Sequence, residues 1–168
     1  VRTKMQNNSE IEKIIDNAGK LAKKYKHQYV TIEHLALALV RYESFNKILT
    51  EYGVDAKAIA TDIDTWLKGM VSIESKDKNV NPKKTNGLER VFNRAGSQVL
   101  FSGRKTVSTI DLYLAIMSEG QSHAHYFFLK HGIQKVEFVG FWQNNYQSVA
   151  PKMSSKDADK LLNEHCIN

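Results

Sequence analysis

Apolar residues recur every three to four positions along most of the chain, and short polar segments separate these runs. This spacing is typical of amphipathic helices. The run 30–40 is apolar on nearly every side, so it predicts a helix that is buried over most of its surface. No alternation of apolar and polar residues is long enough to predict a strand. The pattern therefore predicts an all-α fold of about eight helices.

The run 30–40 has a counterpart at 107–117, which lies 77 residues further along the chain. The same offset aligns Ala95 with Ala18. An internal repeat of this kind decides the fold class before any other signal. We predict two tandem four-helix repeats related by pseudo-two-fold symmetry. Their expected boundaries are 9–69 for repeat one, 70–84 for a polar, lysine-rich and mobile linker, and 85–146 for repeat two.

The two ends of the chain lie outside these repeats. Residues 1–8 are expected to be a disordered N-terminus or the remnant of a tag. Residues 147–168 are expected to hold a second linker and one more short helix. That helix has too little apolar surface to be buried on its own.

The composition indicates a globular domain. The chain has 168 residues, of which 42% are hydrophobic and 25% charged, enough for a core. No apolar run is long enough to span a bilayer, and the N-terminus lacks the apolar segment of a secretion signal. The single cysteine, Cys166, excludes an internal disulfide and indicates a reducing compartment. We therefore expect a cytoplasmic protein that does not bind membranes.

The net charge of +6 raises the question of nucleic-acid binding. One polar loop contributes four of the basic side chains: Lys76, Lys78, Lys83 and Lys84. The chain has no helix-turn-helix spacing and no basic strand rich in aromatic residues. A basic helical protein associated with nucleic acid stays an alternative, while a solvated loop is the favoured interpretation.

The sequence contains no motif for catalysis or for a cofactor. It has no glycine-rich phosphate loop, no Gly-x-Ser-x-Gly elbow and no His-Glu-x-x-His zinc motif. Cys166 has only His165 beside it in sequence, which does not by itself activate a thiol. We therefore predict a non-enzymatic chain without a bound cofactor.

The histidines are candidate metal ligands. His123 and His125 stand two positions apart at a helix start, so they do not share a helix face. We predict no metal site, and we keep only His27 as a candidate ligand for an adventitious zinc ion. His34 is expected at the edge of the core, where it donates a hydrogen bond to the backbone or to a carboxylate.

Two stretches resemble the repeat signatures of the Clp ATPase N-terminal domain family. Residues 27–39 are similar to the first-repeat signature, and 102–104 followed by 107–108 and 112–116 are similar to the second. The resemblance covers residues 9–146. Within the family, the wording of 31–34 is most similar to the ClpA type of AAA+ unfoldase.

This resemblance implies a mobile N-terminal domain on a hexameric protein unfoldase that feeds a Clp peptidase. Such a domain is not catalytic, and it receives protein substrates and adaptor proteins, notably a ClpS-type adaptor. ATP and Mg²⁺ are expected only in AAA+ modules, to which 147–168 form the lead-in. The isolated domain is expected to be a monomer, located in the cytoplasm or, in a plastid-bearing source, in an organelle stroma.

The resemblance also assigns adaptor contacts to the connector after the first helix, the start of the second helix and the start of the fifth. The matching positions are His27, Gln28, Glu33, Thr85, Arg90 and Arg94. We expect an exposed connector at 27–29 and polar side chains at the helix ends that reach a partner.

Alternatives remain at several of these positions. The family's acidic residue after the histidine is Gln28 here, and the lost charge weakens any ion pair with a basic adaptor. A second hypothesis keeps the fold but has the domain bind unfolded substrates, or a different adaptor, directly. Glu33 is alternatively an acid that stabilises the first turn of its own helix. Arg90 and Arg94 are alternatively the solvated face of the fifth helix.

Overall fold

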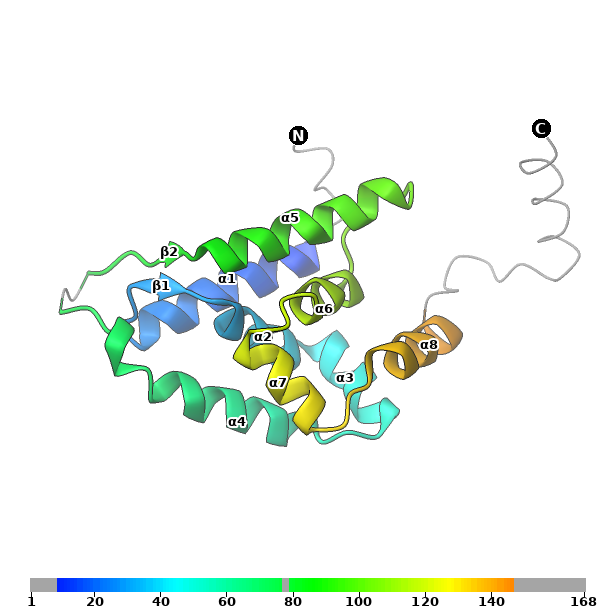
Figure 1. Ribbon diagram of the computed structural model, residues 1–168, viewed down its shortest axis with the longest axis horizontal. Coiled ribbons are helices and arrows are strands. Elements are labelled where there is room, and N and C mark those ends of the chain that lie inside the picture. Colours follow the sequence, from blue (N-terminus) through cyan, green and yellow to red (C-terminus); the bar gives the residue numbers. More distant parts are fainter. Residues whose placement is uncertain (1–8, 77–78, 147–168) are drawn as a thin grey trace, which may run out of the picture. The chain divides into compact units, whose positions relative to one another are not determined.

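The computed structural model describes residues 9–76 and 79–146, and eight α-helices account for most of them (Figure 1). The predicted all-α architecture, with four helices in each repeat, is confirmed. The expectations for 1–8 and 147–168, including Cys166, lie outside the described residues. The helices are α1 (Ser9–Lys24), α2 (Ile32–Arg41), α3 (Glu43–Tyr52), α4 (Ala56–Lys68), α5 (Asn86–Phe101), α6 (Thr109–Met117), α7 (His123–Lys130) and α8 (Lys135–Asn145).

The chain divides into two compact units, and the boundary falls at the start of α8. The first unit ends at Lys135 and contains α1 to α7. The second begins at Val136, and its described part is the remainder of α8. All of the candidate site residues belong to the first unit.

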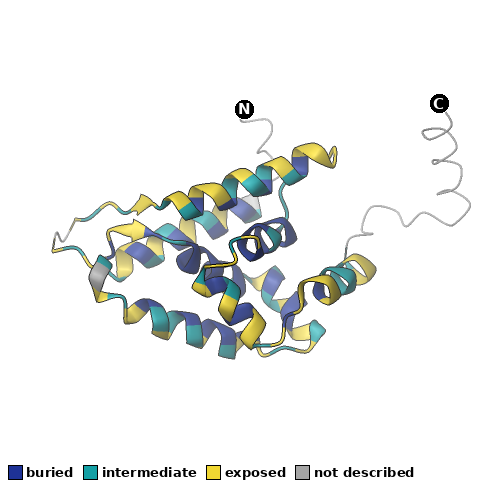
Figure 2. Ribbon diagram, viewed as in Figure 1, coloured by how far each residue is buried: buried dark blue, intermediate teal, exposed yellow. Residues whose placement is uncertain are grey.

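Helix α2 lies at the centre of the first unit and contacts each of the other six helices there. All of its residues from Ile32 to Val40 are buried, as Figure 2 shows by colour. Leu35, Leu37 and Leu39 are fully buried. Each side chain of this kind stabilises the fold by about 1.5–3 kcal/mol relative to an exposed one. The apolar run 30–40 therefore forms the buried helix that its pattern predicts.

The two repeats share their local stop signals. Gly53 ends α3 at φ 108°, and Gly132 follows α7 at φ 86°. The turn after α1 has Lys26 at φ 60°, and the turn after α5 has Gly103 at φ 73°, 77 residues later. The same left-handed turn is thus made by a lysine in one repeat and by a glycine in the other, and only glycine adopts it without strain.

The expectation that the fold lacks strands was wrong at one place. Strand β1 (Tyr29–Val30) pairs in parallel with strand β2 (Lys83–Lys84), with Tyr29 opposite Lys83 and Val30 opposite Lys84. Two residues are too few to produce an alternating pattern in the sequence, so the pairing was invisible there.

The linker is attached to repeat one at both of its ends. Near its start, a 3-10 helix (Val71–Ile73) is followed by Glu74, which forms a bridge with His27. Near its end, β2 pairs with β1. Both attachments hold the connector between α1 and α2, which we define as residues 27–30.

Candidate docking site

The structure joins the connector and the start of α5, two segments that hold predicted site residues, at one edge of the first unit. The Lys83 backbone N–H donates to the Gln28 carbonyl over 2.9 Å, and the Thr85 N–H donates to the Val30 carbonyl over 3.1 Å. These bonds place the start of α5 directly beside the connector. We call this edge, with Gln28, Thr85, Arg90 and Arg94 on it, the connector edge.

Gln28 is exposed, and both its backbone N–H and its side-chain amide donate hydrogen bonds. Its backbone N–H donates to the Ile73 carbonyl over 2.7 Å, and its side-chain Nε2 donates to the Glu74 carbonyl over 3.3 Å. The side chain lies at the surface, as expected for the connector. The neighbouring Tyr29 is 42% exposed and presents an aromatic ring to solvent.

Thr85 is the N-cap of α5. Its Oγ1 accepts a hydrogen bond from the Leu88 N–H over 3.1 Å, which satisfies one free donor of the first turn. In that turn, a Cβ added to Gly87 would lie 3.2 Å from Ile32 Cδ1 at the start of α2. The glycine therefore permits the close approach that fixes the start of α5 against α2.

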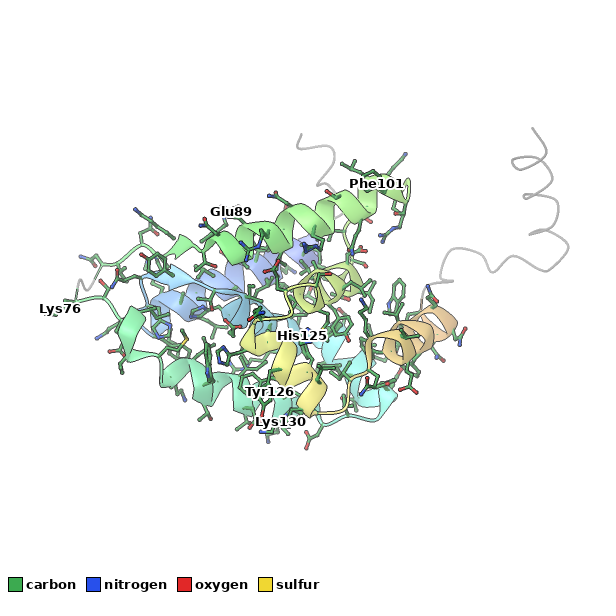
Figure 3. The ribbon with its side chains drawn as sticks, viewed as in Figure 1. Lys76, Glu89, Phe101, His125, Tyr126 and Lys130 are labelled. Atoms are coloured by element: carbon green, nitrogen blue, oxygen red, sulfur yellow. The ribbon has the colours of Figure 1, made fainter. Side chains whose placement is uncertain are left out.

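Arg90 and Arg94 do not form a simple solvated face, because both turn toward Glu119. Arg90 Nη2 lies 2.8 Å from Glu119 Oε1, and its Nε lies 3.2 Å from both oxygens. Arg94 Nη1 lies 3.7 Å from Glu119 Oε2. The hydrogen bond from Arg90 holds the pKa of Glu119 below its usual value. Nothing in the sequence pattern pointed to Glu119. Figure 3 labels Glu89, the exposed residue of α5 that precedes Arg90 in the sequence.

The side chain of Glu33 was expected at the surface, but it is buried. It is 7% exposed, and its Oε2 accepts a hydrogen bond from the Ala124 N–H over 3.0 Å. Ala124 lies in the first turn of α7, so this carboxylate caps α7 and also faces the positive end of its dipole. In this conformation Glu33 holds repeat two against α2 and presents no side chain to a partner.

His27 was expected in an exposed connector, but it is fully buried. Its Nδ1 lies 2.9 Å from Nε2 of His34, which is fully buried as well. His34 was expected at the edge of the core as a donor to the backbone or to a carboxylate. Instead its Nδ1 accepts a hydrogen bond from the Thr31 N–H over 2.9 Å, completing a capping box at the start of α2.

Repeat two has an ion pair at the corresponding place. Adding 77 to His27 and His34 gives Arg104 and Asp111. Arg104 donates from Nη1 and Nη2 to the two carboxylate oxygens of Asp111 over 2.8 and 2.7 Å. Asp111 also accepts from the Ser108 N–H over 2.8 Å, in the same capping-box position as His34. Repeat two thus joins the turn after its first helix to its second helix by a charged pair. Repeat one makes the same connection with two neutral imidazole rings.

Burial keeps the histidine pair neutral. It lowers the pKa of His34 to about 3, with a smaller contribution from His27. Burial also lowers the pKa of His27, while the nearby Glu74 acts in the opposite direction. The described residues contain no group of three or more His, Cys, Asp or Glu side chains placed to hold a metal ion. None of the described helices is both long and apolar enough to cross a membrane.

The fold and these sites define a class of protein, a helical domain of two tandem repeats in which each repeat buries a capped central helix. Residues 7–131 match the Clp repeat (R) N-terminal domain, and the chain belongs to this family. The resemblance seen in the two repeat signatures is therefore confirmed.

One relative is the ClpA homolog protein of Fuscovulum blasticum, which is 30% identical over 137 residues. The match covers 79% of this chain and 17% of that protein, so the chain spans about a sixth of the length of this relative. The name of this relative agrees with the ClpA type, which the sequence resembled most.

Two solved structures share the fold. The Hsp104 N-terminal domain from Candida albicans matches with a TM-score of 0.71 and 14% identity, over 89% of this chain and 95% of that one. The N-terminal domain of ClpD from Arabidopsis thaliana matches with a TM-score of 0.63 and 12% identity, over 83% and 93%. At such identities the likeness concerns the fold alone.

Proposed function

We propose that the chain is the adaptor- and substrate-docking N-terminal domain of an ATP-dependent ClpA-like unfoldase that feeds a Clp peptidase. Family membership and the similarity to a ClpA homologue support the unfoldase. The observation that carries the docking role is the pairing of β1 with β2, which gathers Gln28 and Thr85 on one polar edge.

The partner on the connector edge is a ClpS-type adaptor. Gln28, Thr85, Arg90 and Arg94 supply the contacts, while the buried His27 and Glu33 position the connector and α2 beneath them. Because Gln28 is neutral, Arg90 and Arg94 are the charged members of this set, and to reach an acidic group of the adaptor they must exchange part of their contact with Glu119. The domain does no chemistry, and ATP and Mg²⁺ bind to AAA+ modules of a hexameric parent in the cytoplasm or a stroma.

Isothermal titration of the chain with a ClpS-type adaptor tests this proposal. Arg90→Ala should weaken binding about 10-fold or more, as loss of a charged interface contact does. Lys47→Ala is the matched control, because Lys47 is an exposed cation on α3, away from the connector edge. Gln28→Glu restores the family's acidic residue and should tighten binding to a basic adaptor. No heat of binding with the unchanged chain would overturn the adaptor role.

Direct binding of unfolded substrates is the second candidate function, and one feature favours it. A cavity of about 480 Å³ lies between α1 and α5, next to β2. Ile15, Gly19, Leu88 and Phe92 give it apolar walls, and Lys83 and Lys84 line its edge. An apolar groove with a few polar groups suits an extended peptide.

Gly19→Leu tests this second function by filling the cavity. A Cβ at Gly19 meets nothing within 4 Å, so the new side chain enters open space. Gly96→Leu is the matched control, because it is the equivalent position of α5, is equally open and does not line the cavity. If the groove binds unfolded protein, Gly19→Leu alone should reduce retention of a reduced, alkylated polypeptide. Equal retention by both variants contradicts this role. Retention on DNA at low salt, with the logarithm of affinity falling linearly with the logarithm of salt concentration, would instead favour nucleic-acid binding.

A further inference from the structure

The hydrogen bonds around the histidine pair define the protonation of both rings. A backbone N–H only donates, so His34 Nδ1 must accept from Thr31 N–H and carry no proton. The proton of neutral His34 is then on Nε2, which donates to Nδ1 of His27. The proton of neutral His27 is therefore on its own Nε2. This atom is buried and has no hydrogen-bond partner among the described residues.

A proton added to this chain of bonds breaks at least one of them. If His27 gains a proton on Nδ1, that N–H faces the N–H of His34 across 2.9 Å. If His34 turns over its tautomer to accept, its Nδ1–H can donate to Thr31 Oγ1, 2.9 Å away, but it then faces the Thr31 N–H, which loses its acceptor. Either arrangement buries a charged ring and sets two donors against each other inside the protein, so protonation favours separation of the rings.

The segments beside the histidine pair are the connector itself and the part of the linker that is hydrogen-bonded to it. Ser75 N–H donates to the Lys26 carbonyl over 2.6 Å, and Gln28 N–H donates to the Ile73 carbonyl over 2.7 Å. The Tyr25 ring from the end of α1 lies 5.7 Å from the His27 ring, and its hydroxyl bonds Asp64 of α4. Glu74 is the charged group that acts on His27 from the linker, and the carboxylate of Glu33 in α2 is turned away to Ala124. Separation of the rings therefore displaces residues 27–28 and 73–75 before it disturbs the rest of the core.

We propose that the buried His27–His34 pair is a proton-sensitive latch that holds the connector edge closed at neutral pH and releases it on acidification. Repeat two has no such latch, because Arg104 and Asp111 form a charged pair at the same place. The latch itself does not depend on the proposed docking role. Only its expected consequence, reversible loss of adaptor binding, rests on that role.

The sign and size of the effect come from linkage. The closed state binds protons less readily than the open state, in which a histidine has a pKa of about 6.5. The stability of the closed state relative to the open state is therefore greatest above that pH. It decreases as the pH falls below it. Each histidine that binds a proton only when open raises the opening constant about 10-fold per pH unit. Between pH 6.5 and 4.5 the connector should therefore open about 50-fold more often for one such histidine, since half of the open state is already protonated at pH 6.5.

Amide hydrogen exchange of the full 168-residue chain tests the latch without any adaptor. From pH 6.5 to 4.5, protection at the Gln28 and Ser75 amides should fall about 50-fold, after correction for intrinsic exchange. Protection at the Leu37 and Leu39 amides of α2 should stay well above that at Gln28 and Ser75 at every pH, because local opening is more frequent than global unfolding. Equal protection at all four amides would mean that they exchange through global unfolding and would overturn the proposal, as would constant protection at the connector.

Two variants separate the latch from the fold. The double variant His27→Arg with His34→Asp transplants the pair of repeat two and should remove the pH dependence at Gln28 and Ser75. His34→Gln keeps a capping-box acceptor and one titrating ring, so it should keep the pH dependence only in part. An unchanged pH profile in both variants would overturn the proposal.

Adaptor titrations at pH 7.5 and 5.0 then test the consequence. Binding should weaken on acidification for the unchanged chain and not for the transplanted pair, which controls for titration of the adaptor. If neither chain binds at pH 7.5, the docking role fails while the exchange data still decide the latch. If both chains weaken equally, the latch does not control docking.

Discussion

Glu33 Oε2 in α2 accepts a hydrogen bond from the Ala124 N–H over 3.0 Å, which joins residues 91 positions apart in the chain. Both partners are buried, Ala124 completely. One carboxylate of repeat one thereby completes the N-terminus of α7 in repeat two, where Ser122 caps only the His125 N–H. The contact explains why an acidic residue occupies a buried position of the central helix.

Removing this carboxylate should destabilise the fold. Glu33→Ala leaves the Ala124 N–H buried without an acceptor, and we expect a loss of about 1–2 kcal/mol in the free energy of unfolding. Glu33→Gln keeps an oxygen acceptor and should lose less. Urea denaturation measures both changes, and Glu89→Ala on the exposed side of α5 is the control. Equal stability of Glu33→Ala and the unchanged chain would contradict the capping role.

The neutral histidine pair should make stability depend on pH. Burial lowers the pKa of His34 to about 3 and lowers the pKa of His27 as well, whereas both titrate near 6.5 in the unfolded chain. Stability should therefore be constant above about pH 6.5 and fall below it, by up to about 1.4 kcal/mol per pH unit for each histidine. Urea unfolding at several pH values measures this slope, and His34→Gln should reduce it. A slope unchanged by His34→Gln would assign the pH dependence to other groups.

The ion pair of repeat two should respond in a different way. Arg104→Ala leaves the Asp111 carboxylate, which is 2% exposed, with only its Ser108 bonds. Because Arg104 is partly solvated, we expect a cost of about 1–3 kcal/mol rather than that of a fully buried pair. Arg104→Lys keeps the charge but loses the two-pronged geometry, and should recover part of the loss. Thermal unfolding compares the two, and an equal loss in both would show that geometry, not charge, is decisive.

Lys26 and Gly103 offer a matched pair of backbone substitutions. Lys26 has φ 60°, a strained value for a residue with a side chain, and Gly103 adopts φ 73° at the equivalent place. Lys26→Gly should therefore stabilise the chain by up to about 1 kcal/mol, and Gly103→Ala should destabilise it by about as much. Both changes are read from the midpoint of urea unfolding. Destabilisation by Lys26→Gly, stabilisation by Gly103→Ala, or no effect at either site would contradict the left-handed conformation.

Local signals predicted the elements well. Helical periodicity placed all eight helices, and Thr31, Ser108 and Thr85 hold helix starts through bonds that span only three residues. The 77-residue offset predicted the doubled fold, because equal apolar spacing requires equal packing. Such information is contained in short stretches of the chain, where a residue and its partners are neighbours in sequence.

The candidate site was predicted only in outline. The resemblance selected Gln28, Arg90 and Arg94, and the structure leaves Gln28 and Arg90 exposed on the connector edge. It could not indicate that Glu119 holds both arginines, because no periodic or capping pattern links α5 to the end of α6. Nor could it indicate burial of His27, because a polar residue in a short connector looks exposed until a distant segment covers it.

The order of amino acids by itself established the set of helices and their duplication, both of which depend on apolar spacing that repeats within one or two turns. Folding in three dimensions decided which polar groups are enclosed. The bonds Ser75–Lys26, Thr85–Val30 and Ala124–Glu33 each close a long loop. A loop of that length leaves almost no trace in local composition, since its closure depends on the packing of all the helices between its ends.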